Sequence, residues 1–237
     1  MVATPLAPRG GSTRRHLSTL VVCSLFGATL IRSARRWGGR RAGAAAATVA
    51  VSTAVVERIG TATGVPFGRY AYSAALRPHV ADVPVIVPLA WFAMAVPARE
   101  TASAVLGTAS TRTTRVALGS AALTAWDLFL DPQMVGEDYW RWRRSGAYRG
   151  VPVSNYVGWV LTGFGVMAAL EFLLPPGRPD PVLTGEYAYM ATMETVGFAA
   201  FFRDPVVAAV GGVAMVPLAT AAVGRLAGRW PGRAVAW

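Results

Sequence analysis

Long apolar segments recur along the chain, separated by short polar or basic connections. They cover residues 17–31, 42–59, 83–98, 116–131, 157–174, 187–202 and 205–223. Almost no charge interrupts them, and most lack the polar face that a helix on the surface of a soluble bundle requires. The pattern predicts an all-α, polytopic membrane bundle of about seven transmembrane helices. Because several segments are shorter than the ~20 residues that cross a bilayer, a soluble bundle of buried helices is the alternative.

The two ends of the chain differ from this apolar region. Residues 1–16 are polar, basic and proline-containing, so we expect a disordered tail, followed by one transmembrane domain over 17–223 and a basic tail over 224–237. Arg14 and Arg15 before an apolar segment resemble a twin-arginine export signal. However, a second basic cluster and no small-residue cleavage site follow Ile31. An uncleaved first span is therefore favoured.

Composition supports a membrane location. Hydrophobic residues make up 54% of the 237 residues and charged residues 15%, against roughly 25% charged in soluble domains. The net charge of +11 comes from arginines in short tracts between apolar segments, as in membrane-flanking loops and unlike a nucleic-acid surface. We expect a multi-pass protein of the cell membrane that contacts the lipid bilayer and binds no nucleic acid. The arginines divide almost equally between the two sides and leave the orientation open.

Metal-ligating residue types are scarce. The chain has one cysteine, Cys23, and two histidines, His16 and His79. One cysteine allows neither an internal disulfide framework nor a thiolate metal cluster, and two histidines are too few for a histidine-rich site. We therefore predict no metal.

A few carboxylates stand out, because hydrocarbon penalises an ionisable side chain by a few kcal/mol. Asp127 and Asp131 are one helical turn apart and share a face, so they would tend to share a proton and could supply a general acid. Glu194 falls mid-segment, on a face otherwise apolar and aromatic. Glu57 and Glu171 lie near segment ends, where an interfacial role is plausible. Alternatively, Asp127 and Glu194 are structural and Asp131 ends its helix at the headgroups.

Two connections are unusually aromatic. Residues 57–78 contain Tyr70 and Tyr72 among glycines and prolines, which predicts a re-entrant segment beside a pocket or an ordinary interfacial loop. Residues 139–159 mix tyrosine and tryptophan with arginine, as membrane interfaces do. Asn155 in this stretch either orients a water molecule or caps the next helix.

Five motifs occur in order between about residues 50 and 165: GVPFGRYAY (64–72), PLAWFAMAVPA (88–98), AWDLFLDPQM (125–134), W-x-W (140–142) and GAYRGVPVSNYVGW (146–159). Together they resemble the carotenoid biosynthesis protein family that includes the CruF-type carotenoid hydratases. The resemblance implies an integral membrane enzyme, without a known redox cofactor, that adds water across the terminal isopropylidene double bond of an acyclic carotenoid end and leaves a tertiary alcohol. Monocyclic C40 carotenoids and C50 precursors of bacterioruberin are substrates in the family.

Hydration of this kind requires a proton donor, a positioned water and surroundings that tolerate a tertiary cation. Aromatic faces stabilise a desolvated cation by ~2 kcal/mol or more. We therefore expect Asp127 to be the acid, with Asp131 or Glu194 as its charge partner or as the base that positions water. The expected contacts with substrate, cation or water are Tyr70, Tyr72, Trp126, Asn155, Tyr156 and Trp159, and Glu57 is a further candidate.

Three other functions are compatible with a helical membrane protein. A carotenoid-binding scaffold would organise other membrane enzymes of the pathway and leave its pigment unchanged. A small-solute transporter would need polar residues along several spans, and only isolated carboxylates occur. An intramembrane aspartic protease needs carboxylates that meet across two helices, and no pair favours it.

Overall fold

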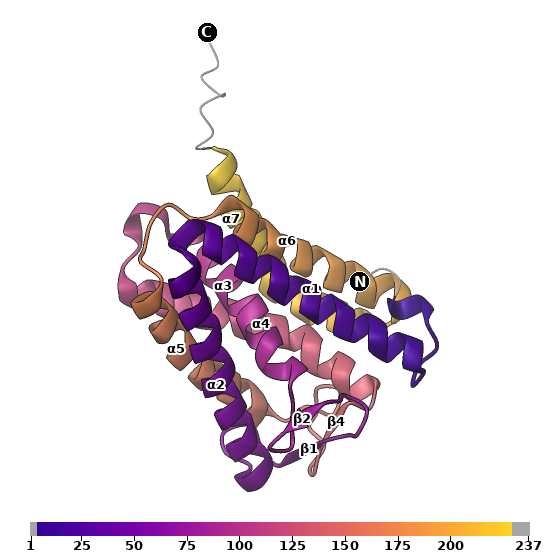
Figure 1. Cartoon of the computed structure of the whole chain (residues 1–237). Helices are drawn as coiled ribbons and strands as arrows, with labels where there is room; N and C mark the ends of the chain where they lie inside the picture. The colour runs from indigo at the N-terminus through magenta and orange to yellow at the C-terminus, as the bar shows by residue number, and fades with distance from the viewer. Residues whose placement is uncertain (1–3, 229–237) are drawn as a thin grey trace.

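Every apolar segment of the sequence corresponds to an α-helix in the structure, a computed structural model that describes residues 4–228 (Figure 1). Within these residues the long helices are α1 (Ser12–Trp37), α2 (Gly39–Thr63), α3 (Ile86–Leu106), α4 (Arg112–Gly136), α5 (Val153–Leu173), α6 (Pro181–Val196) and α7 (Pro205–Ala227). A short π-helix, η3 (Gly197–Phe201), continues α6. The predicted all-α class is confirmed.

Four of these helices, α1, α2, α5 and α7, are long and apolar enough to cross a membrane. Helices α3 and α4 carry arginines and carboxylates, and α6 is only 16 residues long. Arg99 and Glu100 of α3 and Asp127 and Asp131 of α4 lie inside the bundle, whereas Arg112 at the start of α4 is exposed. The structure thus supports a membrane protein, and the number of seven spans remains a prediction.

Helix α3 is the centre of the bundle. It contacts all six other long helices, and Figure 1 shows it with α4 behind α1 and α2. Phe92, Met94 and Val96 of α3 have no exposed surface. Burial on all sides is the expected position for a helix without a polar face.

Close contact between α4 and α5 depends on two glycines. A Cβ on Gly163 would lie 2.7 Å from Ser120 Oγ, and one on Gly119 would lie 2.8 Å from Met167 Sδ. Ser120 Oγ also donates a hydrogen bond to the Val160 carbonyl at 2.8 Å. Small residues and interhelical hydrogen bonds are the usual means of close helix packing in membranes. They bring the acidic face of α4 against the start of α5.

Two connections far apart in sequence pair at one end of the bundle. Strand β1 (Tyr70–Tyr72) is antiparallel to β4 (Trp140–Trp142), with Tyr70 opposite Trp142 and Tyr72 opposite Trp140 (Figure 1). A second short hairpin joins β2 (His79–Val80) to β3 (Val83–Pro84). Within the aromatic segment at 57–78, Phe67, Tyr70 and Leu76 are buried against the bundle, while most of the residues between them are exposed or half-buried.

The N-terminal region is more ordered than the sequence predicts. Helix α1 begins at Ser12, inside the expected disordered tail, and Thr4–Leu6 form a 3-10 turn. Arg14 is 3% exposed and pairs with Glu137 at 2.5 Å. At the other end α7 extends to Ala227, and residues 229–237 of the predicted tail lie outside the described residues.

A buried ion-pair network joins the helices at the end of the bundle opposite the β1–β4 pair. Arg99, 2% exposed, donates to Glu171 at 2.8 Å, to Glu100 at 2.8 Å and to the Leu174 carbonyl at 2.8 Å. Glu171 also accepts from Arg115 at 2.5 Å. Glu171, expected at the interface from its place in the sequence, is therefore buried and fully paired.

We expect Arg99→Met to lower the free energy of unfolding by about 3 kcal/mol, because it removes the charged donor to one oxygen of Glu171 and to one oxygen of Glu100, both buried. The fall would appear in the thermal unfolding of the detergent-solubilised protein. Arg141→Met is the matched control, since the Arg141 side chain is 75% exposed and pairs with Asp138 at the surface, where such pairs contribute ~1 kcal/mol or less. Equal effects of the two substitutions would show that the network does not stabilise the fold.

Candidate active site

Asp127 and Asp131 lie on the inner face of α4 and are 0% and 3% exposed. The α-helix continues beyond Asp131 to Gly136, so the interpretation of Asp131 as a helix end at the headgroups is wrong. The Asn155 side-chain amide donates to Asp127 Oδ2 at 2.9 Å and also to Asp131 Oδ2. Trp140 Nε1 donates to Asp131 Oδ1 at 3.0 Å. One amide therefore joins both acids.

Asn155 lies in the first turn of α5, but its side chain makes no capping hydrogen bond. The helix begins after Pro152, and the amide of Asn155 points instead to α4. The expected alternative, a helix cap, is therefore wrong. Asn155 orients the two carboxyl groups.

The remaining oxygen of Asp127, Oδ1, is buried and receives no hydrogen bond from the described residues. The Asn155 amide nitrogen reaches an oxygen of each carboxyl group, so the two groups lie side by side. A carboxylate can only accept, so a hydrogen bond between two carboxyl groups requires that one of them carry a proton. The geometry thus suits a pair of carboxyl groups that holds one proton.

Glu57 belongs to the same region. Its side chain is buried and accepts hydrogen bonds from Tyr70 Oη, from Tyr72 Oη at 2.8 Å and from Trp91 Nε1 at 3.1 Å. Its sequence neighbour Arg58 points elsewhere and pairs with Asp82 at 3.7 Å. Glu57 is therefore buried inside the protein near the end of α2 and lies beside Asp131, with which it lines one cavity.

The two tyrosines act as donors to Glu57. Burial, and secondarily the neighbouring Glu57 side chain, raises the pKa of Tyr70 and Tyr72 above that of a free phenol. Both phenols therefore keep their protons at any physiological pH. They hold Glu57 in one position with neutral groups only.

A small cavity of about 20 Å³ lies between Glu57 and Asp131. A site needs roughly 10–15 Å³ of such space, and two to four polar partners, to hold one water molecule. The cavity is lined by polar and aromatic side chains: Glu57, Phe67, Tyr70, Tyr72, Asp131, Trp140, Trp142, Asn155 and Trp159. Its volume and lining fit one ordered water.

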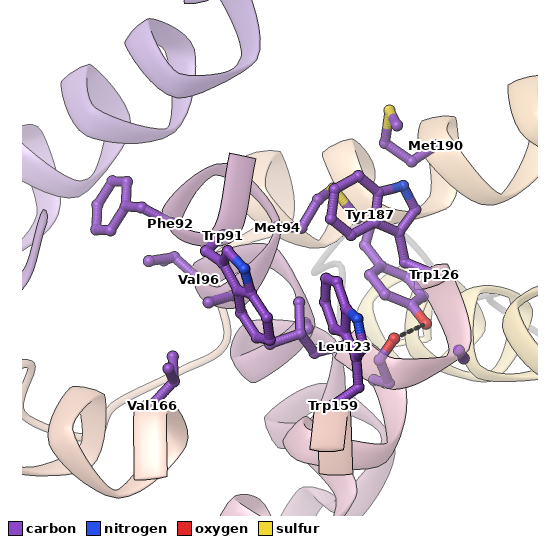
Figure 2. Close-up of a cluster of buried hydrophobic side chains, with 14 of the residues drawn as sticks. Trp91, Phe92, Met94, Val96, Leu123, Trp126, Trp159, Val166, Tyr187 and Met190 are labelled. Carbon is purple, nitrogen blue, oxygen red and sulfur yellow. Dashed lines mark hydrogen bonds between the residues drawn. The ribbon is translucent and has the colours of Figure 1, made fainter. Parts of the chain in front are cut away.

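Aromatic rings form the inner wall of this region. Trp91 and Trp159 stack with centroids 3.9 Å apart, and Trp126 meets Trp159 edge to face at 6.1 Å (Figure 2). Tyr70 and Trp142 lie across from each other at 5.7 Å. Of the residues expected to face a cation, Trp159 and Tyr70 line the cavity, whereas Trp126 supports Trp159 from behind.

Four predicted site residues do not line the cavity: Asp127, which lies behind Asn155 and Asp131, and Trp126, Tyr156 and Glu194. Tyr156 follows Asn155 on α5 and packs against Tyr148 at 6.1 Å, and its buried hydroxyl has no partner among the described residues. Glu194 lines a different groove, of about 110 Å³, between α1, α4 and α6, which it shares with Trp126 and Met190. The structure therefore brings Asp131, and not Glu194, to Asp127.

The sequence reasoning missed two tryptophans that donate to the carboxylates, Trp91 and Trp140. Both lie in motifs that were noted, and an indole N–H in an apolar segment needs an acceptor when buried. Among residues 4–228, no group of three or more His, Cys, Asp or Glu side chains is arranged to hold a metal ion.

The fold and the buried acid pair describe a helical membrane protein with a small polar site inside an aromatic shell. The sequence profile of the carotenoid biosynthesis protein family matches residues 18–226. The chain belongs to this family, as its motifs indicate.

A particular relative is the bisanhydrobacterioruberin hydratase of Haloarcula japonica, which is 33% identical over 135 residues. The match covers 56% of this chain and 46% of the relative, so it spans about half of that protein's length. The similarity agrees with membership of the carotenoid biosynthesis family. No solved structure matches the chain.

Proposed function

We propose that this protein is a carotenoid hydratase that adds water to the terminal isopropylidene double bond of an acyclic carotenoid end group. The observation that carries the proposal is the water-sized cavity beside a buried pair of carboxyl groups. The site thereby combines a proton donor, room for one water molecule and aromatic side chains that can stabilise a cation. The family relationship and the similarity to a hydratase point to the same reaction.

Asp127 is the proposed acid. Its Oδ1 has no donor among the described residues, and it lies beside Asn155 and Asp131, which line the cavity. We assign to Asp127 the proton that reaches the substrate. Transfer of this proton to the less substituted alkene carbon uses the π electrons for the new C–H bond and leaves a tertiary carbocation. The faces of Trp159 and Tyr70 line the cavity and stabilise positive charge, by ~2 kcal/mol or more when water is excluded.

Asp131 is the proposed base. It faces the cavity together with Asn155, so a water held there can add to the cation as its proton passes to the Asp131 carboxylate. The hydrogen bond between the two carboxyl groups then returns the proton to Asp127. The cycle consumes one alkene and one water, yields one tertiary alcohol and is redox-neutral.

Glu57 places a carboxyl group on the other side of the cavity, where its ionised form would supply negative charge. Three neutral donors hold it, and the described residues place no arginine against it. A preorganised charge of this kind favours a cation that develops nearby. Tyr72 thus contributes by holding Glu57 in place. Tyr156, next to Asn155 on α5, is proposed to pack around the acid pair.

We place the protein in the cell membrane with seven spans, as one domain over 17–223, because α3, α4 and α6 lie alongside the four apolar helices. Its substrate is membrane-dissolved carotenoid. Other membrane enzymes of carotenoid biosynthesis would supply that substrate and consume the alcohol.

The test is expression in a host that makes acyclic carotenoids, followed by mass spectrometry of the pigments. We expect products heavier by one water, or by two if both ends react. Pigment that co-purifies with the protein and keeps its mass would favour the scaffold function instead. Unchanged carotenoids over a range of acyclic substrates, with the protein inserted in the membrane, would contradict the proposal.

A further inference from the structure

A second, larger depression lies on the outer surface between α2 and α5. It has a volume of about 520 Å³ and an almost entirely apolar lining. We call it the α2–α5 groove; its lining residues on the two helices include Thr48, Ser52, Val56, Ile59, Leu161, Gly165 and Ala169. Both helices are among the four that can cross a membrane. The groove therefore opens toward lipid.

The α2–α5 groove follows the helix axis. Thr48, Ser52, Val56 and Ile59 recur at spacings of three or four residues and so form one stripe along α2. At 1.5 Å per residue the stripe is ~16 Å long. The shape suits an extended hydrocarbon chain that lies along the helices.

One end of the groove meets the candidate active site. Val65 and Pro66 line the groove, and the next residue, Phe67, lines the water-sized cavity. The Phe67 ring is wedged between the two helices, because a Cβ on Gly60 of α2 would lie 2.9 Å from it and one on Gly158 of α5 would lie 2.5 Å from it. A single buried ring thus separates the apolar groove from Glu57, Asp131 and Asn155.

The position of the cavity along α2 and α5 is consistent with a groove that leads to it. Glu57 lies two turns before the end of α2, and Asn155 lies in the first turn of α5. The cavity is therefore near one surface of the bilayer, and the groove extends from it toward the middle. A linear hydrocarbon that lies in the membrane along the helices would bring its end group to the cavity.

From this continuity we infer that the α2–α5 groove binds the apolar chain of a linear isoprenoid substrate and delivers its end group to the site past Phe67. The inference rests on the proposed function for its choice of occupant. An acyl chain of a membrane lipid is the competing occupant, and it would make the groove irrelevant to catalysis.

Gly165→Leu tests the inference, because the groove-lining glycine has open space around it: a Cβ there meets nothing within 4 Å. The leucine fills the groove without a clash inside the protein. The matched control is Gly185→Leu, at an exposed glycine of α6 that also has nothing within 4 Å and lines none of the cavities described above. Two quantities are measured in membranes of a carotenoid-producing host: the rate of hydration and the amount of acyclic carotenoid that co-purifies with each variant.

We expect Gly165→Leu to lower both quantities about tenfold, through lost burial of the hydrocarbon chain, while Gly185→Leu matches the wild type. Wild-type values for Gly165→Leu, or equal losses in both variants, would overturn the inference. If the wild type hydrates no carotenoid, the proposed function fails, and the amount of co-purified pigment becomes the test of the groove. Loss of pigment from Gly165→Leu, but not from Gly185→Leu, would support binding in the α2–α5 groove. Pigment that is absent from all three proteins, or equal in all three, would overturn the inference.

Discussion

Asp127→Asn is expected to lower the rate of carotenoid hydration by about 10²–10⁴-fold, the usual contribution of a general acid. Asparagine has nearly the same size as aspartate but carries no transferable proton. The buried side chain would still meet Asn155, which approaches Asp127 Oδ2 at 2.9 Å, so the helix packing should survive. Hydrated and unhydrated pigment are measured by mass spectrometry and normalised to the inserted protein.

The matched control for Asp127→Asn is Asp82→Asn. The Asp82 side chain is 81% exposed and pairs with Arg58 at 3.7 Å. We expect this variant to hydrate carotenoid at the wild-type rate. Normal hydration by a well-inserted Asp127→Asn protein would remove Asp127 from the mechanism.

Asp131→Asn is expected to have the second largest effect, a loss of about 10²-fold or more, because the cavity water would lose the base that accepts its proton. Asp131 also accepts from Trp140 at 3.0 Å, so part of the effect could be structural. Thermal unfolding in detergent separates the catalytic effect from the structural one. It gives the fraction of folded protein, and a loss of stability alone would leave the hydration rate per folded molecule unchanged.

The double variant Asp127→Asn/Asp131→Asn distinguishes a functional pair from two independent residues. Groups that act as a unit are strongly non-additive. We therefore expect the double variant to be about as slow as Asp127→Asn alone. Losses that multiply would show that the two carboxyl groups do not share one proton cycle.

The positions of the helices could be read from the sequence because a membrane helix satisfies its own backbone and needs only an apolar surface. Once that segment is a helix, the four-residue spacing of Asp127 and Asp131 places both side chains on one face. Their partner Asn155 was a candidate, but its contact with both acids depends on the close packing of α4 and α5, which involves Gly119 and Gly163.

Other parts of the candidate site depend on contacts that no local pattern reveals. Glu57 is adjacent to Arg58, yet consecutive residues of a helix point about 100° apart, and only the pairing of β1 with β4 brings Tyr70 and Tyr72 to the carboxylate. Glu194 was attractive because it lies on an apolar helix face. The packing of the whole bundle decides which helix that face meets. In the structure Glu194 lines a groove that is distinct from the water-sized cavity beside Asp131.

The most direct test of the central claim is hydration by purified protein, in detergent or lipid nanodiscs, of an acyclic carotenoid in water labelled with heavy oxygen. The account predicts that wild-type protein forms a tertiary alcohol that contains the heavy isotope, and that Asp127→Asn forms it at least about 10²-fold more slowly. An unlabelled alcohol, or equal rates for both proteins, would contradict the proposed addition of water at the aspartate pair.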